Sequence, residues 1–442
     1  MPASPSRFLS LGFGESDAES RAALVDRATA CFQRETGQDP SWTWFVPGRI
    51  EVFGKHTDYA GGRSLLAAVP RGFAVVAGPR EDGLVRVIDA RYGGEVVVDP
   101  LDTARTYTGW TKYVAVTARR LAANFAGARL GADIAMASDL PRAAGVSSSS
   151  ALVVGIASAL IERAGLADRP DWREAIASAL DLAGYLGAAE NGLTFRALAG
   201  TSGVGTHGGS EDHTAILTCR SGRLSMYSYV PVVHRGDELM PPAWRFVVMS
   251  SGVEADKASG VLDRYNRASL ATRALLDLWN MHSGRPRPTL AAALAAGGDA
   301  ATELRQIVAE QPHRGFDAAE LGRRLSHFVA EDERVPLAGL AFRRADATGL
   351  GALSAASQGE ADRWLGNQVP ETRELAALAR EHGAFAASSF GAGFGGSVWA
   401  LVEAGDAEAF AARWRAAYQA KHPKVGSVES FVAMPSPGLT RL

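Results

Sequence analysis

Residues 48–62 read GRIEVFGKHTDYAGG, and no other stretch of the chain carries more information. The segment begins as an apolar strand and then places Lys55, His56, Thr57 and Asp58 together in one turn. Such a polar cluster suits the recognition of sugar hydroxyls, and the alternative is an Asx-type turn with solvated charges. The segment is not a P-loop, because its glycines are one position too far apart and a histidine follows the lysine.

A second segment, residues 141–152, reads PRAAGVSSSSAL and lies between a predicted strand and an apolar helix. The N-terminus of a helix offers free N–H groups and the positive end of a dipole, which is what a phosphate requires. Serine hydroxyls add donors or a ligand for Mg²⁺. The alternative is a serine-capped helix, although four consecutive serines exceed what one cap needs.

Two further segments could contribute to a site. Residues 391–396 read GAGFGG, where glycines allow the backbone to approach a ligand, or where they simply form a tight hairpin. Glu190 ends a predicted helix and Asp212 lies in an acidic segment, so they could act in phosphoryl transfer as a Mg²⁺ ligand and as the group that orients a hydroxyl. The alternative for both acids is a solvated surface position.

The composition excludes several classes of protein. The 442 residues are 47% hydrophobic and 21% charged with a net charge of −2, which is typical of a globular chain and argues against nucleic-acid or membrane partners. Two cysteines are too few for a disulfide scaffold. Because no apolar run reaches the length of a signal peptide or membrane helix, we expect a cytoplasmic protein.

Strands and helices mix along the whole chain, which predicts two α+β domains with a boundary near 220–245. We expect a helix that Ser16 caps and Gly37 ends, a strand pair at 42–53 and an antiparallel meander at 65–69, 73–77, 84–88 and 96–98. The other expected helices are 112–125, 149–164, 172–191, most of 258–380 with turns at 284–288, 297–298 and 349–351, and 407–420. The other expected strands are 132–137, 214–217, 224–229, 245–249, 384–389, 397–402 and 428–433.

Taken in order, these segments resemble the GHMP kinase superfamily, and most closely its galactokinase branch. Residues 48–62 match a signature that reads approximately G-R-x-N-x-x-G-E-H-T-D-Y-x-x-G, and residues 141–152 and 391–396 match the phosphate loop and the G-A-G-F-G-G motif. WTKY at 110–113 and the Tyr265–Asn266 pair are also similar to family motifs. The resemblance implies a two-domain α+β fold with an N-terminal ribosomal-protein-S5-like domain (1–230), a C-terminal α/β-plait domain (231–442) and an active site in the cleft between them.

The resemblance also implies a reaction: an ATP- and Mg²⁺-dependent sugar kinase that phosphorylates the C1 hydroxyl of galactose or a related sugar, as a monomer or weak homodimer. It assigns catalysis to Asp212 and Arg49, and Mg²⁺ binding to Ser149 and Glu190. The implied sugar-binding residues are Lys55, His56, Asp58 and Tyr265. The implied ATP-binding residues are Trp110, Gly145, Ser147, Ser148, Ser149, Gly393 and Gly395.

The chain departs from the family pattern at sugar-reading positions. Lys55 stands where galactokinases have a glutamate that reads a hydroxyl near C6, Glu51 replaces an asparagine and His213 replaces a glutamine. The segment between Glu190 and Asp212 is about ten residues longer than in ordinary galactokinases. Lysine is also rare here, because only 5 of the 46 basic residues are lysines.

Two alternatives follow from these departures. An ammonium in place of a carboxylate inverts the local charge, which suggests an anionic sugar such as a uronate with Lys257 in the same neighbourhood. The other interpretation is that Lys55 pairs with an internal acid such as Glu51 or Glu211. A different class of protein, a sugar- and ATP-binding sensor without activity, would require loss of the catalytic residues, and Arg49, Asp212 and the serines are all present.

Overall fold

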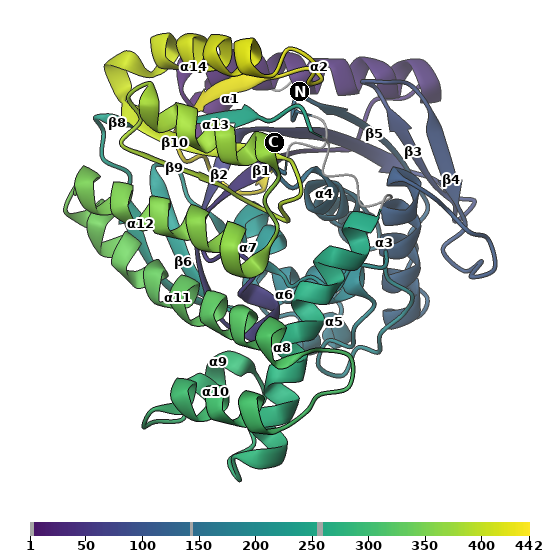
Figure 1. The fold of residues 1–442 in the computed structure, drawn as a ribbon. Helices are drawn as coiled ribbons and strands as arrows, with labels where there is room; N and C mark the ends of the chain where they lie inside the picture. Colours follow the sequence, from purple (N-terminus) through teal and green to yellow (C-terminus); the bar gives the residue numbers. More distant parts are fainter. Residues whose placement is uncertain (1–3, 142–144, 254–259) are drawn as a thin grey trace.

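The computed structural model describes residues 4–141, 145–253 and 260–442, which form two β-sheets with helices around them (Figure 1). The larger sheet has eight strands in the order β12-β1-β2-β5-β3-β4, with β6 pairing β2 and β7 pairing β6. Its strands are β1 (Trp42–Phe53), β2 (Arg63–Pro79), β3 (Val85–Asp89), β4 (Glu95–Val98), β5 (Ala132–Ser138), β6 (Arg223–Ser228), β7 (Val233–Leu239) and β12 (Thr440–Arg441).

Helices cover the larger sheet because each presents an apolar face to it. Helix α2 buries Val25 and Phe32 against Phe45 and Val76 of the sheet. On the other side, Val153 and Ile156 of α4 join the main core together with Val46 and Val75 of the strands. The helices of this part are α1 (Pro5–Ser10), α2 (Glu15–Thr36), η1 (Asp58–Ala60), α3 (Trp110–Asn124), α4 (Ser148–Arg163), η2 (Leu166–Asp168), α5 (Pro170–Ala175), α6 (Ala179–Asn191) and α7 (Glu211–Thr218).

The smaller sheet is antiparallel and has the order β11-β8-β10-β9. Helices α13 and α14 lie over it, where Leu375 and Trp414 pack on Val247 and Val398 (Figure 1). Its elements are β8 (Trp244–Ser250), α13 (Pro370–Glu381), β9 (Ala386–Ser389), β10 (Ser397–Glu403), η5 (Ala404–Asp406), α14 (Ala407–Lys421) and β11 (Ser430–Ala433).

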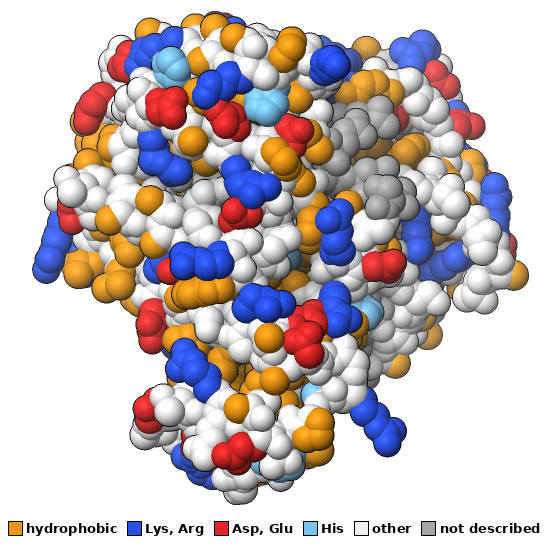
Figure 2. All heavy atoms as spheres, viewed as in Figure 1, with side chains coloured by type: hydrophobic (Ala, Val, Ile, Leu, Met, Phe, Trp, Pro, Cys, Tyr) orange, Lys and Arg blue, Asp and Glu red, His pale blue; other side chains and the backbone are white. Residues whose placement is uncertain are grey.

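A helical segment separates β8 from α13 in the sequence, and α9 and α10 project from one end of the molecule (Figure 1). Figure 2 shows charges of both signs spread over this face, with Lys and Arg side chains gathered around the end of α12 and α8. The helices are α8 (Leu262–His282), α9 (Leu290–Leu294), α10 (Ala300–Glu310), α11 (Ala318–Arg343), α12 (Ala347–Glu360) and η4 (Ala361–Leu365). No helix in the described part of the chain is long and apolar enough to cross a membrane.

Several predicted elements differ from the structure. The two strands expected at 65–69 and 73–77 are one long strand, β2, and the expected meander is wrong at β3, which pairs with β5 in parallel. The strand expected at 214–217 is helix α7. The helix expected at 172–191 is two helices, α5 and α6, and the turn expected at 349–351 lies inside α12. Gly37 ends α2 as predicted, but the N-cap is Gly14 instead of Ser16.

Candidate active site

Arg49 and Asp212 form an ion pair on the wall of a cavity of about 80 Å³. Strand β1 carries Arg49 and the first turn of α7 carries Asp212. Nε and Nη2 of Arg49 both lie 2.7 Å from Oδ1 of Asp212, and Nη1 donates to the carbonyl of Gly145 at 2.6 Å. Burial disfavours ionisation of Asp212, but the Arg49 guanidinium, together with Ser147 and His213, holds its pKa below the ordinary value. The cavity therefore contains an oriented, ionised carboxylate beside a fixed cation.

The serine segment, residues 141–152, places the start of α4 against Arg49 and Asp212. Ser147 caps the helix with φ near +61°, and α4 begins at Ser148. Ser150 Oγ lies within hydrogen-bond distance of both Asp212 Oδ2 (3.3 Å) and Glu190 Oε2 (3.4 Å) and can donate to either, while Ser149 lines the same cavity without either bond. The fourth serine, which the sequence analysis did not select, is therefore the one that contacts both carboxylates.

Glu190 lies in the last turn of α6, and its Oε2 is 3.1 Å from Nε2 of His213. Carboxylate and hydroxyl oxygens from Glu190, Ser149 and Ser150 surround one part of the cavity, and oxygens are the donors that Mg²⁺ prefers. The described residues contain no group of three or more His, Cys, Asp or Glu that could hold a metal ion. Such a donor set fits an ion that shares its coordination with substrate phosphates and water.

His56 and Asp58 of the 48–62 segment, called the sugar signature below, also line the cavity, as does Tyr265 of α8. The rings of His56 and Tyr265 are 5.3 Å apart, and Nδ1 and Nε2 of His56 lie 3.0 Å from Tyr59 Oη and 3.1 Å from the Ala392 carbonyl. Burial lowers the pKa of His56 to about 3, so the ring is neutral. Burial raises the pKa of Asp58 to about 6, although its carboxylate accepts the Glu211 N–H at 3.1 Å.

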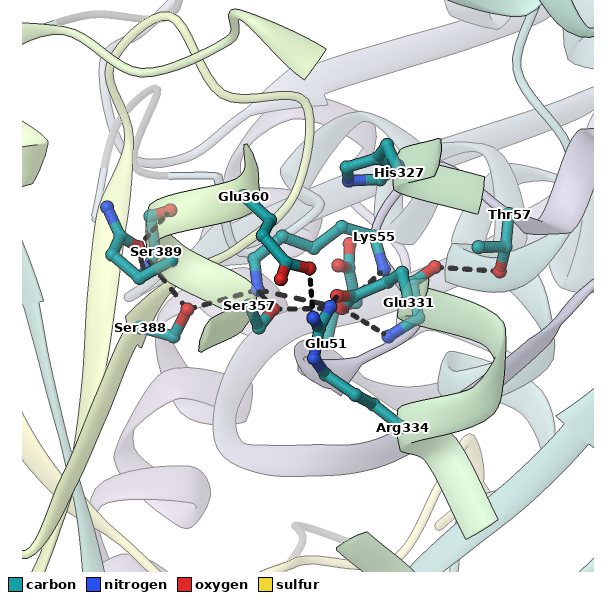
Figure 3. A network of polar contacts seen from close by, with 12 residues as sticks. Glu51, Lys55, Thr57, His327, Glu331, Arg334, Ser357, Glu360, Ser388 and Ser389 are labelled. Carbon is teal, nitrogen blue, oxygen red and sulfur yellow. Dashed lines mark hydrogen bonds and ion pairs between the residues drawn. The ribbon is translucent and has the colours of Figure 1, made fainter. Parts of the chain in front are cut away.

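Lys55 does not line this cavity, which corrects its assignment as a sugar-binding residue. Its side chain is fully buried among α11, α12 and β9 (Figure 3). Nζ donates to Ser357 Oγ at 2.6 Å and to Ser388 Oγ at 3.0 Å, and it lies 3.9 Å from Glu331 Oε1. The interpretation as an internal ion pair is confirmed, but the partner is Glu331 and neither Glu51 nor Glu211.

Figure 3 also shows why Glu331 holds this lysine. The carboxylate accepts the backbone N–H groups of Gly54 and Lys55, the Ser357 hydroxyl at 3.0 Å and Arg334 Nη1 at 2.9 Å. Burial opposes ionisation of Glu331, but Lys55 and Arg334 outweigh it and lower its pKa. The network fixes the turn that carries the sugar signature against the C-terminal helices.

A second pair of acids, Glu51 and Glu211, lines the cavity beneath Arg49. Oε2 of Glu51 accepts the Gly391 N–H at 3.2 Å, whereas its buried Oε1 has no hydrogen-bond donor. Burial raises the pKa of Glu51 to about 7, and burial together with the charge of Glu51 raises the pKa of Glu211. The charge of Glu51 thus raises the pKa of Glu211, whereas hydrogen bonding to Glu211 lowers that of Glu51, so the two buried carboxyl groups favour sharing a proton. The only sequence signal for this pair was the glutamate in place of asparagine at position 51.

A neighbouring cavity of about 280 Å³ has an aromatic and apolar wall beside the start of α4. Trp110 and Tyr113 line it together with Ser148 and Ser149, so the WTKY segment and the serine segment, which both contain implied ATP-binding residues, meet there. Lys112 faces elsewhere, because its Nζ donates to the Val204 carbonyl at 2.8 Å.

The glycine loop, residues 391–396, has one part that lines a cavity and one part that does not. Gly391 and Ala392 line the sugar-signature cavity, whereas Gly393 and Gly395 line neither of the two cavities. A Cβ on Gly393 would lie 2.4 Å from the Asn367 carbonyl, and one on Gly395 would lie 2.6 Å from the Val253 carbonyl. These glycines therefore allow close backbone packing behind the cavity. Residues 142–144 of the serine segment and Lys257 lie outside the described residues.

Three family models match the chain in the order of its motifs: the galactokinase galactose-binding signature at 30–79, the GHMP kinases N terminal domain at 112–193 and the GHMP kinases C terminal at 340–420. The chain is therefore similar to the GHMP kinase superfamily, and within it to the galactokinases. Curated relatives include a galactokinase of Streptomyces coelicolor, 28% identical over 93% of this chain and 97% of the relative. A galactokinase of Chloroflexus aggregans is 28% identical over 88% and 91%.

Solved structures of GHMP kinases share the fold. A galactokinase of Lactococcus lactis, complexed with galactose, superposes with a TM-score of 0.76 at 22% identity and covers 95% of this chain and 100% of that one. A mevalonate kinase of L. major, in complex with R-mevalonate, gives a TM-score of 0.53 at 16% identity over 90% and 99%. The predicted GHMP kinase fold is therefore confirmed, while the division into 1–230 and 231–442 stays a prediction.

Proposed function

We propose that this protein transfers the γ-phosphoryl group of ATP to the C1 hydroxyl of galactose or a closely related neutral sugar. The observation that carries the proposal is the Arg49–Asp212 pair at 2.7 Å, in a cavity that His56, Asp58 and Tyr265 also line. The galactokinases among its relatives agree with this substrate.

Each residue of the cavity has its own role in the phosphoryl transfer. The sugar lies against His56, Asp58 and Tyr265, and Asp212 accepts the proton of the C1 hydroxyl as its oxygen bonds to the γ-phosphorus. The bond between that phosphorus and the bridging oxygen breaks, and ADP leaves. Arg49 keeps Asp212 ionised and stabilises the charge on the transferring group, so catalysis rests on positioning and electrostatics.

ATP occupies the cavity beside Trp110 in this proposal, with its phosphates at Ser148, Ser149 and the backbone of Gly145 and Ser147. Ser149 and Glu190 would hold Mg²⁺, which supplies charge neutralisation to the phosphates, and Ser150 is added to that set because it contacts Glu190. Gly393 and Gly395 support the loop instead of contacting the nucleotide. We place the enzyme in the cytoplasm. We expect a monomer or weak homodimer, and gel filtration tests this oligomeric state.

The structure removes the basis for an anionic sugar. Lys55 was the reason to expect a uronate, and its ammonium is buried on Glu331 outside the cavity. Five carboxyl groups line the cavity, with Arg49 as its one arginine. A uronate carboxylate would face these acids, so a neutral sugar is favoured.

A coupled assay with ATP, Mg²⁺ and a panel of galactose, glucose and galacturonate tests the proposal. We expect turnover with galactose, and a fall in kcat of about 10³-fold in Asp212→Asn because a proton acceptor contributes on the order of 10²–10⁴. Nucleotide affinity, measured by calorimetry, should change less than about threefold. Asp277→Asn, an exposed acid on α8, is the matched control.

Two results would contradict this function. If no sugar is phosphorylated by the wild type although nucleotide and galactose bind, the protein is a sensor. If galacturonate is a better substrate than galactose, the charge argument from the buried Lys55 is wrong.

A further inference from the structure

A third cavity, of about 250 Å³, lies between α8, α11, η4 and the glycine loop, and arginines dominate it. We call it the arginine pocket. Figure 2 shows basic side chains gathered over this part of the molecule. Its charged and aromatic lining residues are Arg264, Arg267, Arg323, Arg324, Arg363, Glu320, Trp364 and Phe394. Five guanidinium groups therefore face one carboxylate.

Aromatic rings contact several of these arginines. The guanidinium carbon of Arg264 lies 4.5 Å from the centre of the Phe394 ring, and that of Arg363 lies 5.3 Å from the Trp364 ring. Arg267 forms an ion pair with Glu320 at 2.6 Å. Arg264, Arg323 and Arg363 are exposed to solvent and have no ion pair within residues 4–141, 145–253 and 260–442, whereas Arg267 is paired with Glu320.

The arginine pocket is distinct from the catalytic cavities but adjoins them. It shares no lining residue with the sugar-signature cavity or the cavity beside Trp110. Arg324 connects it to the sugar signature, because its buried guanidinium donates to the carbonyl of His56 and, at 3.1 Å, to Tyr59 Oη. Arg264 directly precedes Tyr265, and Phe394 belongs to the same loop as Ala392.

We propose that the arginine pocket binds a small phosphate monoester in addition to the substrates. Guanidinium groups match phosphate oxygens with paired donors, and they are the usual choice where several must converge on one anion. The rings of Trp364 and Phe394 offer an apolar face to the organic part of the ligand. Because Arg324 also holds the backbone of His56, an anion in this pocket changes the KM for sugar more than kcat.

Calorimetry on the full chain tests the site independently of catalysis. The wild type is first saturated with galactose and a non-hydrolysable ATP analogue, and then titrated with inorganic phosphate, galactose 1-phosphate or adenosine monophosphate in separate arms. We expect saturable binding that weakens about tenfold or more in Arg264→Gln/Arg323→Gln, because hydrogen bonds to charged groups contribute substantially to binding. Arg305→Gln/Arg314→Gln, at exposed arginines of the projecting helical segment, should leave binding unchanged.

The arms identify the ligand and can overturn the proposal. Tighter binding of galactose 1-phosphate than of phosphate assigns the pocket to phosphorylated sugars, and tighter binding of the nucleotide assigns it to that class. The proposal is wrong if the saturated wild type binds none of the three ligands. It is also wrong if Arg264→Gln/Arg323→Gln binds them as tightly as the control Arg305→Gln/Arg314→Gln. An unchanged thermal unfolding midpoint in Arg264→Gln/Arg323→Gln excludes misfolding as the cause of lost binding. Since no turnover is measured, its failure would not affect the proposed kinase activity.

Discussion

Lys55 differs from its motif in residue type and charge, and it still supports the site from outside the cavity. In the motif the position carries a sugar-reading glutamate, and here it carries a lysine whose ammonium is fully buried on Ser357, Ser388 and Glu331. The residue therefore fixes the turn of His56 and Asp58 without touching the cavity. A buried ion pair specifies this arrangement more than it stabilises the fold, because desolvation of both charges offsets their attraction.

Removing one partner of this pair should nevertheless be costly. Lys55→Met leaves Glu331 with less compensation inside the protein, and we expect a loss of about 3 kcal/mol in the free energy of unfolding. Urea denaturation measures it. The double variant Lys55→Met/Glu331→Gln should recover part of the loss, and Lys424→Met, at an exposed lysine, should cost almost nothing. Equal stability of Lys55→Met and the wild type would show that the buried ammonium contributes nothing.

Glu51 should make the stability depend on pH. Its pKa is raised from the ordinary 4.5 to about 7, chiefly by burial and by the nearby Glu331, against the opposing effect of Arg49 and Lys55. Between about pH 4.5 and 7 the folded state binds a proton that the unfolded state has lost, so the free energy of unfolding falls as the pH rises.

Glu51→Gln removes this contribution. We expect the variant to lose less stability than the wild type between pH 5 and 8, as measured by urea denaturation at each pH. Glu19→Gln, an exposed acid on α2, should keep the wild-type slope. A parallel pH dependence in Glu51→Gln and the wild type would mean that Glu51 is ionised throughout.

At the scale of elements, the backbone of the glycine loop is tightly constrained. Gly393 has φ near +77°, and a Cβ there would meet the Asn367 carbonyl at 2.4 Å. Gly393→Ala should therefore cost about 2 to 4 kcal/mol through backbone strain and steric conflict. Thermal unfolding measures the effect, and Gly405→Ala, where nothing lies within 4 Å of the new Cβ, is the control. An unchanged midpoint in Gly393→Ala would show that the loop adjusts freely.

The elements also show what the sequence could and could not predict. Local signals were sufficient for α3, α4 and β5, whose apolar patterns agree with their environment. They failed at α7, where the β-branched and apolar letters of 214–217 suggested a strand, because α7 is fixed by packing on α4 and α6. They failed again at β2, where Pro70 and Gly72 suggested a turn, although the ladder with β1 continues past a bulge near Pro47.

The candidate site was predictable to a similar degree. The motifs indicated Arg49 and Asp212, which lie 163 positions apart and form the expected pair. The partner of Lys55 was not predictable, because Glu331 lies 276 positions away and belongs to no motif. Ser150 and Glu211 were missed for a different reason: their contacts depend on how α4 and α7 are rotated against each other, which residue types alone do not determine.

At the scale of the whole molecule, the two sheets share one core. Phe53 of β1 packs edge-on against Trp399 of β10 at 6.0 Å, and both belong to the main hydrophobic cluster. The chain also returns to the larger sheet after β11, where β12 pairs with β1. The two halves are thus joined at both the core and the sheet edge, so we expect unfolding to involve them together.

Residues 435–442 offer a test of that coupling, because they hold α7 from its C-terminal side. The N–H groups of Leu439 and Gly438 donate to the carbonyls of Ile216 and Cys219 at 2.6 and 2.8 Å, and the Ser436 N–H donates to Ala68 at 2.9 Å. A chain that stops at residue 434 loses these bonds and about 3 kcal/mol or more of stability, at roughly 1 kcal/mol for each bond.

The same truncation should lower kcat more than it raises the KM for sugar, since the first turn of α7 carries Asp212 while His56 and Asp58 are held by Glu331. Thermal unfolding and the coupled assay measure both effects. Arg441→Ala removes only an exposed ion pair with Glu162 and should change the stability by less than about 1 kcal/mol. If the truncated chain keeps the wild-type kcat, the position of Asp212 does not depend on the returning strand, and α4 and α6 alone are enough to fix the catalytic carboxylate.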